Sequence, residues 1–112
     1  MAFVIKPLGY GTASGMGTTD MYTVPANTSA IVTSIRLINL NVSATATANL
    51  FVKPSGSANT WRIEKPEYFL SANSKLVVDE VLTLGAGDKV QVVCSGSTTP
   101  SYSFMVNGTE RT

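Results

Sequence analysis

The chain has 112 residues and a formal net charge of +1, with eight Lys or Arg against seven Asp or Glu. This length is typical of one domain, and the charges are scattered without a basic stripe, so we expect no contact with DNA or RNA. Histidine, the side chain whose unperturbed pKa lies nearest neutral pH, does not occur, which argues against acid–base catalysis. We therefore expect a binding or structural protein that is not an enzyme and carries no cofactor.

The compartment follows from three features of the sequence. No stretch approaches the roughly 20 apolar residues of a membrane span, so we expect no membrane association. The first residues have a short apolar run without a basic segment before it, which is not the pattern of a signal peptide. The single cysteine, Cys94, stands in phase with Val90 and Val92, and this favours a buried, unreactive thiol. We expect synthesis in the cytoplasm of a host cell.

Residues 1–19 combine an apolar start with a glycine-rich stretch. The glycines between Gly9 and Gly17 fit neither a P-loop nor a dinucleotide-binding fingerprint. We predict that residues 9–19 form a flexible loop and that the whole segment is an arm, mobile in the free protein, that contacts a partner. The alternative is that residues 2–7 form the first edge strand of the fold.

From residue 20 to residue 112, apolar and polar residues alternate in short runs separated by turn sequences such as Pro25-Ala26-Asn27. The runs cover residues 21–24, 29–40, 45–52, 60–65, 68–70, 75–81, 89–95 and 102–106. Short alternating runs at roughly 8–12-residue spacing are typical of β-sandwiches. We predict an all-β fold, an antiparallel, jelly-roll-like β-sandwich with seven or eight strands.

The inward phase of these strands predicts the core. The residues expected to be mostly buried are Ile35, Leu37, Leu50, Val52, Trp61, Val78, Val90, Val92 and Phe104. The longest run, residues 29–40, is apolar on both faces. Its first face holds Ile31, Thr33, Ile35, Leu37 and Asn39, and its second face holds Ala30, Val32, Ser34, Arg36, Ile38 and Leu40. Because one small sandwich leaves such a second face partly uncovered, we predict a homodimer or homotrimer.

One short run carries both an aromatic and a cationic candidate. Trp61 and Ile63 share one side of it, and Arg62 lies on the other. Together with Tyr68 and Phe69, Trp61 offers a stacking platform for a sugar, but core packing is the favoured interpretation. Arg62 is a candidate contact for an acidic partner.

Carboxylates near turns are the remaining candidates for catalysis or metal binding. Asp79, Glu80 and Asp88 flank the segment 82–87, but acid–base chemistry needs a carboxyl in an apolar pocket, and calcium needs several oxygen ligands from one loop. A Ser or Thr nucleophile needs a base beside it, for which only a Ser–Lys pair remains. We interpret the carboxylates as solvated turn residues and predict neither a catalytic residue nor a metal ligand.

Two phrases of the sequence resemble a known group of proteins. In the first, a turn leads into a long strand: MYTVPANTSAIVTSIRLINLN. In the second, a turn separates two strands: LSANSKLVVDEVLTLGAGDKVQVVCSG. Together they resemble small all-β virion proteins of tailed bacteriophages, over residues 20–108. In its size and its lack of a second domain, the chain is most similar to the jelly-roll staple proteins of epsilon-15-like podoviruses.

This resemblance implies a structural virion protein that binds the major capsid protein on the outside of the phage head and stabilises its contacts. The alternatives are a tail, neck or baseplate component and a carbohydrate-binding module of a phage fibre. The family has no catalytic motif to carry over. The candidate partner contacts, taken from the apolar start and from the outward-facing arginine, are Phe3, Val4, Ile5, Leu8, Tyr10 and Arg62.

Overall fold

The computed structural model describes residues 3–14, 17–40, 46–63, 68–70, 74–79, 81–95 and 101–112. These residues form ten strands and no helix, which confirms the all-β class. The strands are β1 (Phe3–Ser14), β2 (Gly17–Thr23), β3 (Ser29–Asn39), β4 (Ala46–Lys53), β5 (Trp61–Arg62), β6 (Tyr68–Leu70), β7 (Lys75–Val78), β8 (Leu82–Leu84), β9 (Lys89–Ser95) and β10 (Ser101–Arg111).

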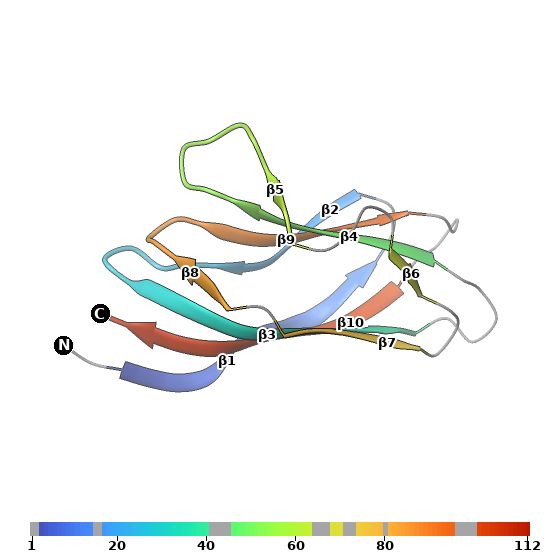
Figure 1. Ribbon diagram of the computed structural model, residues 1–112, viewed down its shortest axis with the longest axis horizontal. Helices are drawn as coiled ribbons and strands as arrows, with labels where there is room; N and C mark the ends of the chain where they lie inside the picture. Colours follow the sequence, from blue (N-terminus) through green and yellow to red (C-terminus); the bar gives the residue numbers. More distant parts are fainter. Residues whose placement is uncertain are drawn as a thin grey trace.

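The strands make two antiparallel sheets that face each other (Figure 1). The first, called here the β1 sheet, has the order β1-β10-β3-β7, and β8 also pairs with β3. The second, the β2 sheet, has the order β2-β9-β4-β5, and β6 also pairs with β4. The ten strands therefore occupy eight positions, and consecutive strands β1 to β4 alternate between the sheets. This is the winding of a jelly roll, as predicted.

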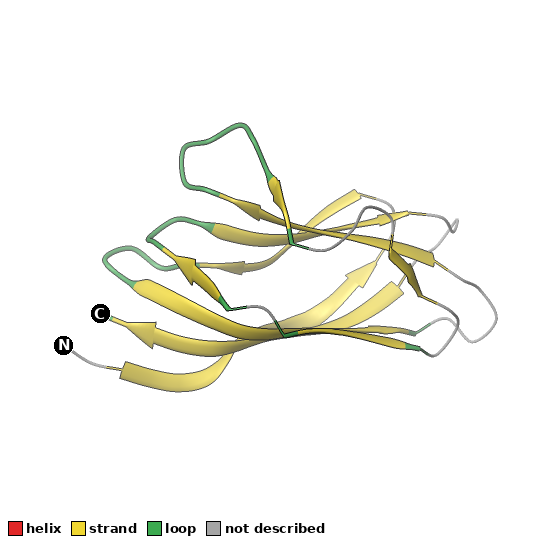
Figure 2. Cartoon of the chain, viewed as in Figure 1, coloured by secondary structure: helices red, strands yellow, loops and turns green. Residues whose placement is uncertain are grey.

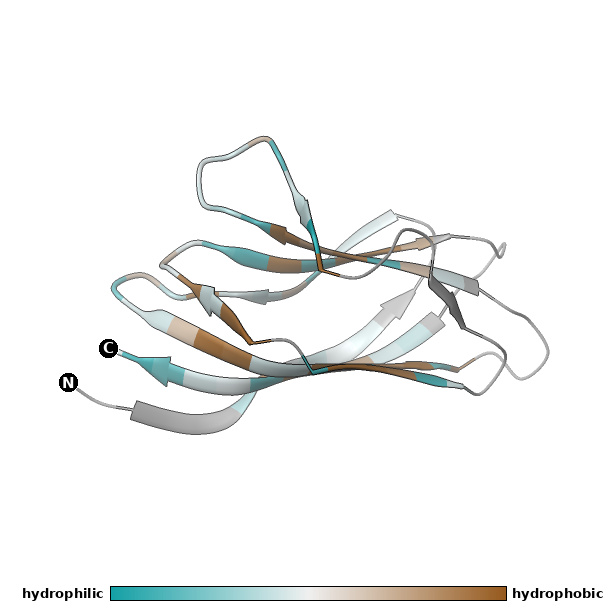
Figure 3. Cartoon of the chain, in the orientation of Figure 1, coloured by the Kyte–Doolittle hydropathy of each residue, from teal (hydrophilic) through white to brown (hydrophobic). Residues whose placement is uncertain are grey.

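The core lies between the sheets, where alternate residues of facing strands meet. Seven of the nine predicted core residues are buried: Ile35, Leu37, Leu50, Val78, Val90, Val92 and Phe104. Val52 is partly buried and packs against them. Hydrophobic segments on β3, β4 and β8 stand out in brown in Figure 3. Burial of these side chains is the main favourable term in folding.

Trp61 is the one predicted core residue that is wrong, because its side chain is 64% exposed. Its phase agrees with the prediction, since Trp61 pairs with the core residue Val52. However, β5 is a two-residue strand at the edge of the β2 sheet, and the loop before it stands clear of both sheets (Figure 2). An inward phase at a sheet edge leaves a large side chain with little cover from the opposite sheet.

A β-bulge overturns the predicted faces of β3. Asn107 pairs with Ser34 and Gly108 pairs with Val32, so Thr33 is an extra residue in the strand. The extra residue reverses the side-chain alternation. Val32, predicted on the outer face, is fully buried, whereas Ile31, predicted with the inward residues, is 44% exposed.

The segment at the start of the chain is an edge strand. β1 pairs with β10 from Phe3 to Ser14, and Gly17 opens β2, so the loop predicted for residues 9–19 is wrong over the described residues. Gly9 allows a close approach here, because a Cβ at this position would collide with the carbonyl oxygen of Met21. The edge-strand alternative is therefore the one that the structure shows.

Candidate interaction surfaces

The outer face of the β1 sheet carries a row of side chains across four strands. The pairing register places Tyr10 of β1, Met105 of β10, Arg36 of β3 and Val77 of β7 side by side. Tyr10 is 74% exposed and Val77 is 43% exposed. The Arg36 guanidinium lies 4.0 Å from the Met105 sulfur. Cross-strand neighbours of this kind form a continuous surface, which we call the apolar row.

Further apolar side chains extend this face. Ile31 lies in β3 beyond the bulge and pairs with Thr83 and Thr109. Leu40 follows β3 directly, in phase with Ile38, and is 46% exposed. Of the six large hydrophobic residues exposed in the described part of the chain, four belong to this side: Tyr10, Ile31, Leu40 and Val77. The outer face of the β1 sheet thus carries several exposed apolar side chains among Ser and Thr residues, with the cations Arg36 and Lys75 beside them.

A small depression lies beside Ile31 at the end of the same sheet. It has a volume of about 160 Å³ and is lined by Ser29, Ala30, Ile31, Thr83, Thr109 and Arg111. A wider and more open depression adjoins it and shares Ser29 and Arg111. Hydroxyl groups and a guanidinium thus line this end of the face.

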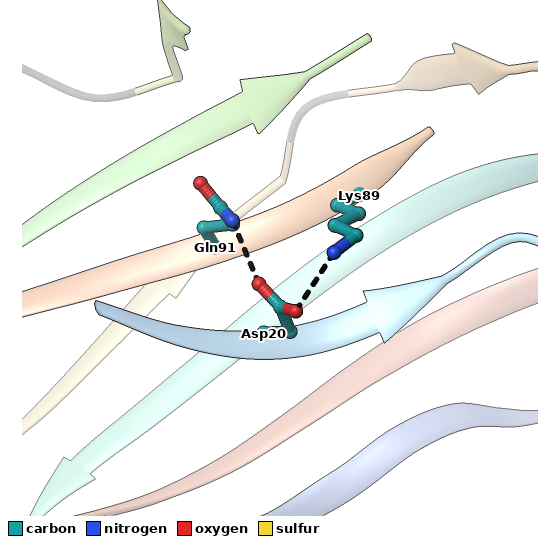
Figure 4. Close-up of polar contacts among 3 residues, drawn as sticks. All are labelled: Asp20, Lys89 and Gln91. Carbon is teal, nitrogen blue, oxygen red and sulfur yellow. Dashed lines mark hydrogen bonds and ion pairs between the residues drawn. The ribbon is translucent and has the colours of Figure 1, made fainter. Parts of the chain in front are cut away.

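The outer face of the β2 sheet has a different character. The Asp20 carboxylate accepts a hydrogen bond of 2.7 Å from the Gln91 amide and forms an ion pair of 3.1 Å with Lys89 (Figure 4). The hydrogen bond from Gln91, together with Lys89, holds the pKa of Asp20 below its usual value. The polar groups of this region therefore bind one another.

Arg62, a predicted partner contact, belongs to this second face. Its side chain is exposed, yet its guanidinium donates a hydrogen bond of 3.0 Å to the Asn49 side chain. The guanidinium carbon also lies 4.9 Å from the centre of the Phe51 ring, a cation–π contact. Arg62 is held against its own sheet and is not part of the apolar row.

The structure separates the predicted contacts of the N-terminal segment. Leu8 is partly buried and packs against the core, whereas Tyr10 is exposed in the apolar row. The structure describes only the backbone pairing with β10 for Phe3, Val4 and Ile5. Sequence reasoning missed most of the apolar row, since its members come from four separate strands and meet only through the register.

Of the predicted turn carboxylates, Asp79 is exposed and Asp88 has a structural role. Asp88 accepts hydrogen bonds from the backbone amides of Ser55 (2.8 Å) and Gly85 (2.9 Å), so it ties two loops together. Glu80 lies outside the described residues. Cys94 is buried, and burial raises the pKa of its thiol to about 11, which confirms the predicted buried thiol.

The described part of the chain contains no group of three or more His, Cys, Asp or Glu positioned to hold a metal ion. Within the same residues, no helix is long and apolar enough to cross a membrane.

Comparison with known proteins gives a fold but no sequence family. The sequence matches no family model and no curated protein. The structure is similar to a chain in the structure of infectious bursal disease virus, Gx strain, with a TM-score of 0.59 over 97% of this chain and 11% sequence identity. For the Gt strain of the same virus, the TM-score is 0.50 at the same identity and coverage.

The present chain spans about a third of the length of those chains (32%). At 11% identity the likeness establishes the fold. The protein is thus an all-β sandwich of a kind that also occurs in a virus structure.

Proposed function

We propose that this chain is a structural virion protein, a decoration or staple protein on the outer surface of a tailed-phage head. It binds the major capsid protein through the outer face of the β1 sheet and stabilises the contacts between neighbouring capsid subunits. The fold shared with a chain of a virus structure supports a role in a virion. The resemblance of residues 20–108 to small phage virion proteins supports the narrower assignment.

The observation that carries this proposal is the apolar row. A contact on this face would remove Tyr10, Val77 and Ile31 from water, and burial of apolar surface contributes about 25 cal/mol per Å². The chain exposes 6014 Å² in total, and a standard interface takes about 800 Å² from each partner. One capsid contact thus uses about an eighth of the surface.

The proposed mechanism is non-covalent binding to the shell, without a catalysed reaction. A rigid two-sheet body presents the same face at every symmetry-equivalent position of a shell, so that weak contacts of many copies add up. Neither nucleic acid nor membrane takes part in this role, and no enzymatic step is required.

A shell-binding assay tests the proposal. Heads lacking this protein are incubated with the wild type, with Val77→Asp and with the matched variant Thr18→Asp, which places the same charge on an exposed strand position of the other sheet. We expect Val77→Asp to weaken binding by about tenfold or more, which corresponds to about 1.4 kcal/mol. Thr18→Asp should bind like the wild type. Equal loss in both variants, with unchanged melting temperatures, would contradict the proposed face.

Copy number separates the decoration role from the tail, neck or baseplate alternative. Quantitative gel or mass-spectrometric analysis of purified particles should find hundreds of copies of a decoration protein. A dozen or fewer copies would assign the chain to the tail or neck instead.

We also propose that copies associate as homodimers or homotrimers on the particle. The 12-residue strand β1 is an edge of its sheet, and the unpaired backbone groups of a long edge offer a surface on which a second copy can pair. Crosslinking on intact particles should yield dimers or trimers, and isolated copies without mutual contact in an image reconstruction would contradict this.

A further inference from the structure

An exposed tryptophan at the edge of the β2 sheet has no role in the core or in the apolar row. Trp61 is 64% exposed, although a Trp side chain commonly buries 150–250 Å² on folding or binding. It is the only tryptophan of the chain. A large aromatic ring that is exposed at a sheet edge is available to stack on a ligand.

The loop that leads to Trp61 is ordered by its own hydrogen bonds. The Ser57 amide donates to the carbonyl of Pro54 at 3.1 Å, which closes a turn. Gly56 has a φ of 73°, a left-handed conformation that this turn needs and that glycine adopts without strain. The Asn59 amide then donates to the Ser57 hydroxyl at 3.0 Å. These hydrogen bonds hold the loop in a defined conformation.

The base of this loop is fixed to a second turn. The Asp88 carboxylate accepts the Ser55 amide at 2.8 Å and the Gly85 amide at 2.9 Å. The two turns are in close contact, since a Cβ on Gly87 would lie 2.6 Å from the Ser55 hydroxyl oxygen. A loop that is already ordered loses little entropy when a ligand binds.

The surroundings of Trp61 fit a sugar better than a protein. Asn59 and Thr60, which precede Trp61 in the chain, are polar and exposed, and the loop is pale to teal over most of its length in Figure 3. Protein hot spots are tightly packed and fully desolvated, whereas a sugar ring offers C–H groups to an aromatic face and hydroxyls to amides and alcohols.

The charge next to Trp61 points away from the site. Arg62 pairs with Phe51 and therefore lies on the opposite side of β5 from Trp61, with its guanidinium bound to Asn49. Residues 54–60 contain no charged side chain, so an uncharged sugar is the ligand class that fits this site. We propose that Trp61 and residues 54–60 form a binding site for the neutral sugar rings of a glycan, with the ring stacked on the indole.

The single tryptophan supplies the readout. Trp61 emission is followed while the full-length protein is titrated with maltohexaose, cellohexaose, mannohexaose and N-acetylchitohexaose, and the protein is also applied to a glycan array. We expect a blue-shifted emission and saturable binding to at least one of these ligands with a Kd of about 1 mM or lower, a range in which weak single-site contacts are measurable.

Variants then locate the site. Trp61→Ala should lower the affinity by about tenfold or more, and Trp61→Phe, which keeps a stacking ring, should lose less. Tyr10→Ala removes the other strongly exposed aromatic among the side chains that the structure describes, and it should bind glycans like the wild type. Because Trp61 is exposed, all three variants should keep the wild-type melting temperature.

The outcomes are decisive and independent of the shell contact. Absence of binding by the wild type to every ligand of the titrations and the array overturns the proposal, and so does unchanged binding by Trp61→Ala. Loss of shell binding by Trp61→Ala without any glycan binding would assign the indole to a protein contact. If Val77→Asp binds shells like the wild type, the glycan result is unaffected, since the two sites lie on different sheets.

Discussion

The two outer faces of this sandwich follow the same alternation but differ in chemistry. On the β2 sheet, Asp20 is bonded to Gln91 and Lys89, and Arg62 is bonded to Asn49. On the β1 sheet, Tyr10, Ile31 and Val77 are exposed, and apart from the Tyr10 hydroxyl these three side chains carry no polar group. A face whose polar groups are already paired gains little from a partner, whereas an apolar face gains by losing its contact with water.

The difference shows why exposure alone does not identify an interface. Arg62 and Arg36 are both exposed, yet Arg62 is committed to a hydrogen bond and a cation–π contact. Arg36 makes a long contact with a thioether sulfur, a weak acceptor. For Arg36 a partner carboxylate would be the stronger ligand, which makes it the better candidate for an acidic contact.

The largest expected effect separates the inner and outer sides of one strand. Leu37 is fully buried, and its neighbour Arg36 is exposed on the opposite face. Leu37→Ala should lower the free energy of unfolding by about 2–5 kcal/mol, because it removes core contacts and leaves a cavity. Arg36→Ala should change it by about 0.5 kcal/mol or less. Chemical denaturation of both variants measures this, and a loss below about 0.5 kcal/mol for Leu37→Ala would refute the assigned phase.

The same strand shows how far the sequence predicts the fold. Its alternation correctly places Ile35 and Leu37 in the core, and the turn at residues 25–27 lies where Pro and Asn indicate it, with Asn27 at a φ of 56°. The bulge at Thr33 was not predictable in this way, because it depends on the partner strand at the other end of the chain. Local patterns fix the periodicity, and pairing fixes the phase.

The candidate surfaces were less predictable than the fold. Tyr10 was found from its apolar neighbourhood, but Met105 and Val77 join it only through the register of β10, β3 and β7. Trp61 was assigned to the core since its phase is inward, and no local signal reports that β5 lies at a sheet edge. Whether a side chain at a sheet edge is exposed depends on how the two sheets pack against each other, which the local sequence does not report.

A second prediction concerns a bond that links the two sheets. The Tyr22 hydroxyl of β2 donates a buried hydrogen bond of 2.6 Å to the Glu110 carboxylate of β10. Tyr22→Phe keeps the ring but removes the donor, so we expect the free energy of unfolding to fall by about 1.5–3 kcal/mol, as for a bond to a charged group. Urea denaturation at pH 7 measures the loss. A variant as stable as the wild type would show that the bond contributes nothing net.

The same tyrosine predicts an alkaline limit to stability. Burial, reinforced by the hydrogen bond to Glu110, raises the pKa of Tyr22 above its ordinary value. The stabilising contribution of this shift is complete below the unfolded-state pKa of about 10, and it falls as the pH rises further, because the unfolded chain loses the proton first. Each such group costs up to about 1.4 kcal/mol per pH unit in that range. Between pH 10 and 11, Tyr22→Phe should therefore lose stability less steeply than the wild type, and parallel curves would contradict the assignment.

The smallest effect is expected on the polar outer face. Asp20 is exposed, and its pKa is lowered chiefly by the hydrogen bond from Gln91. Its contribution is present above the unfolded-state pKa of about 3.9 and is lost as the pH falls through the lower folded value. Since exposed ion pairs contribute about 0–1 kcal/mol, Asp20→Asn should cost less than about 1 kcal/mol at pH 7, and the difference from the wild type should shrink below pH 3. Thermal unfolding at both pH values measures this. A loss as large as that of Tyr22→Phe would show that the paired groups of the β2 sheet are a stability element of the fold, and the contrast between the two faces would then need another explanation.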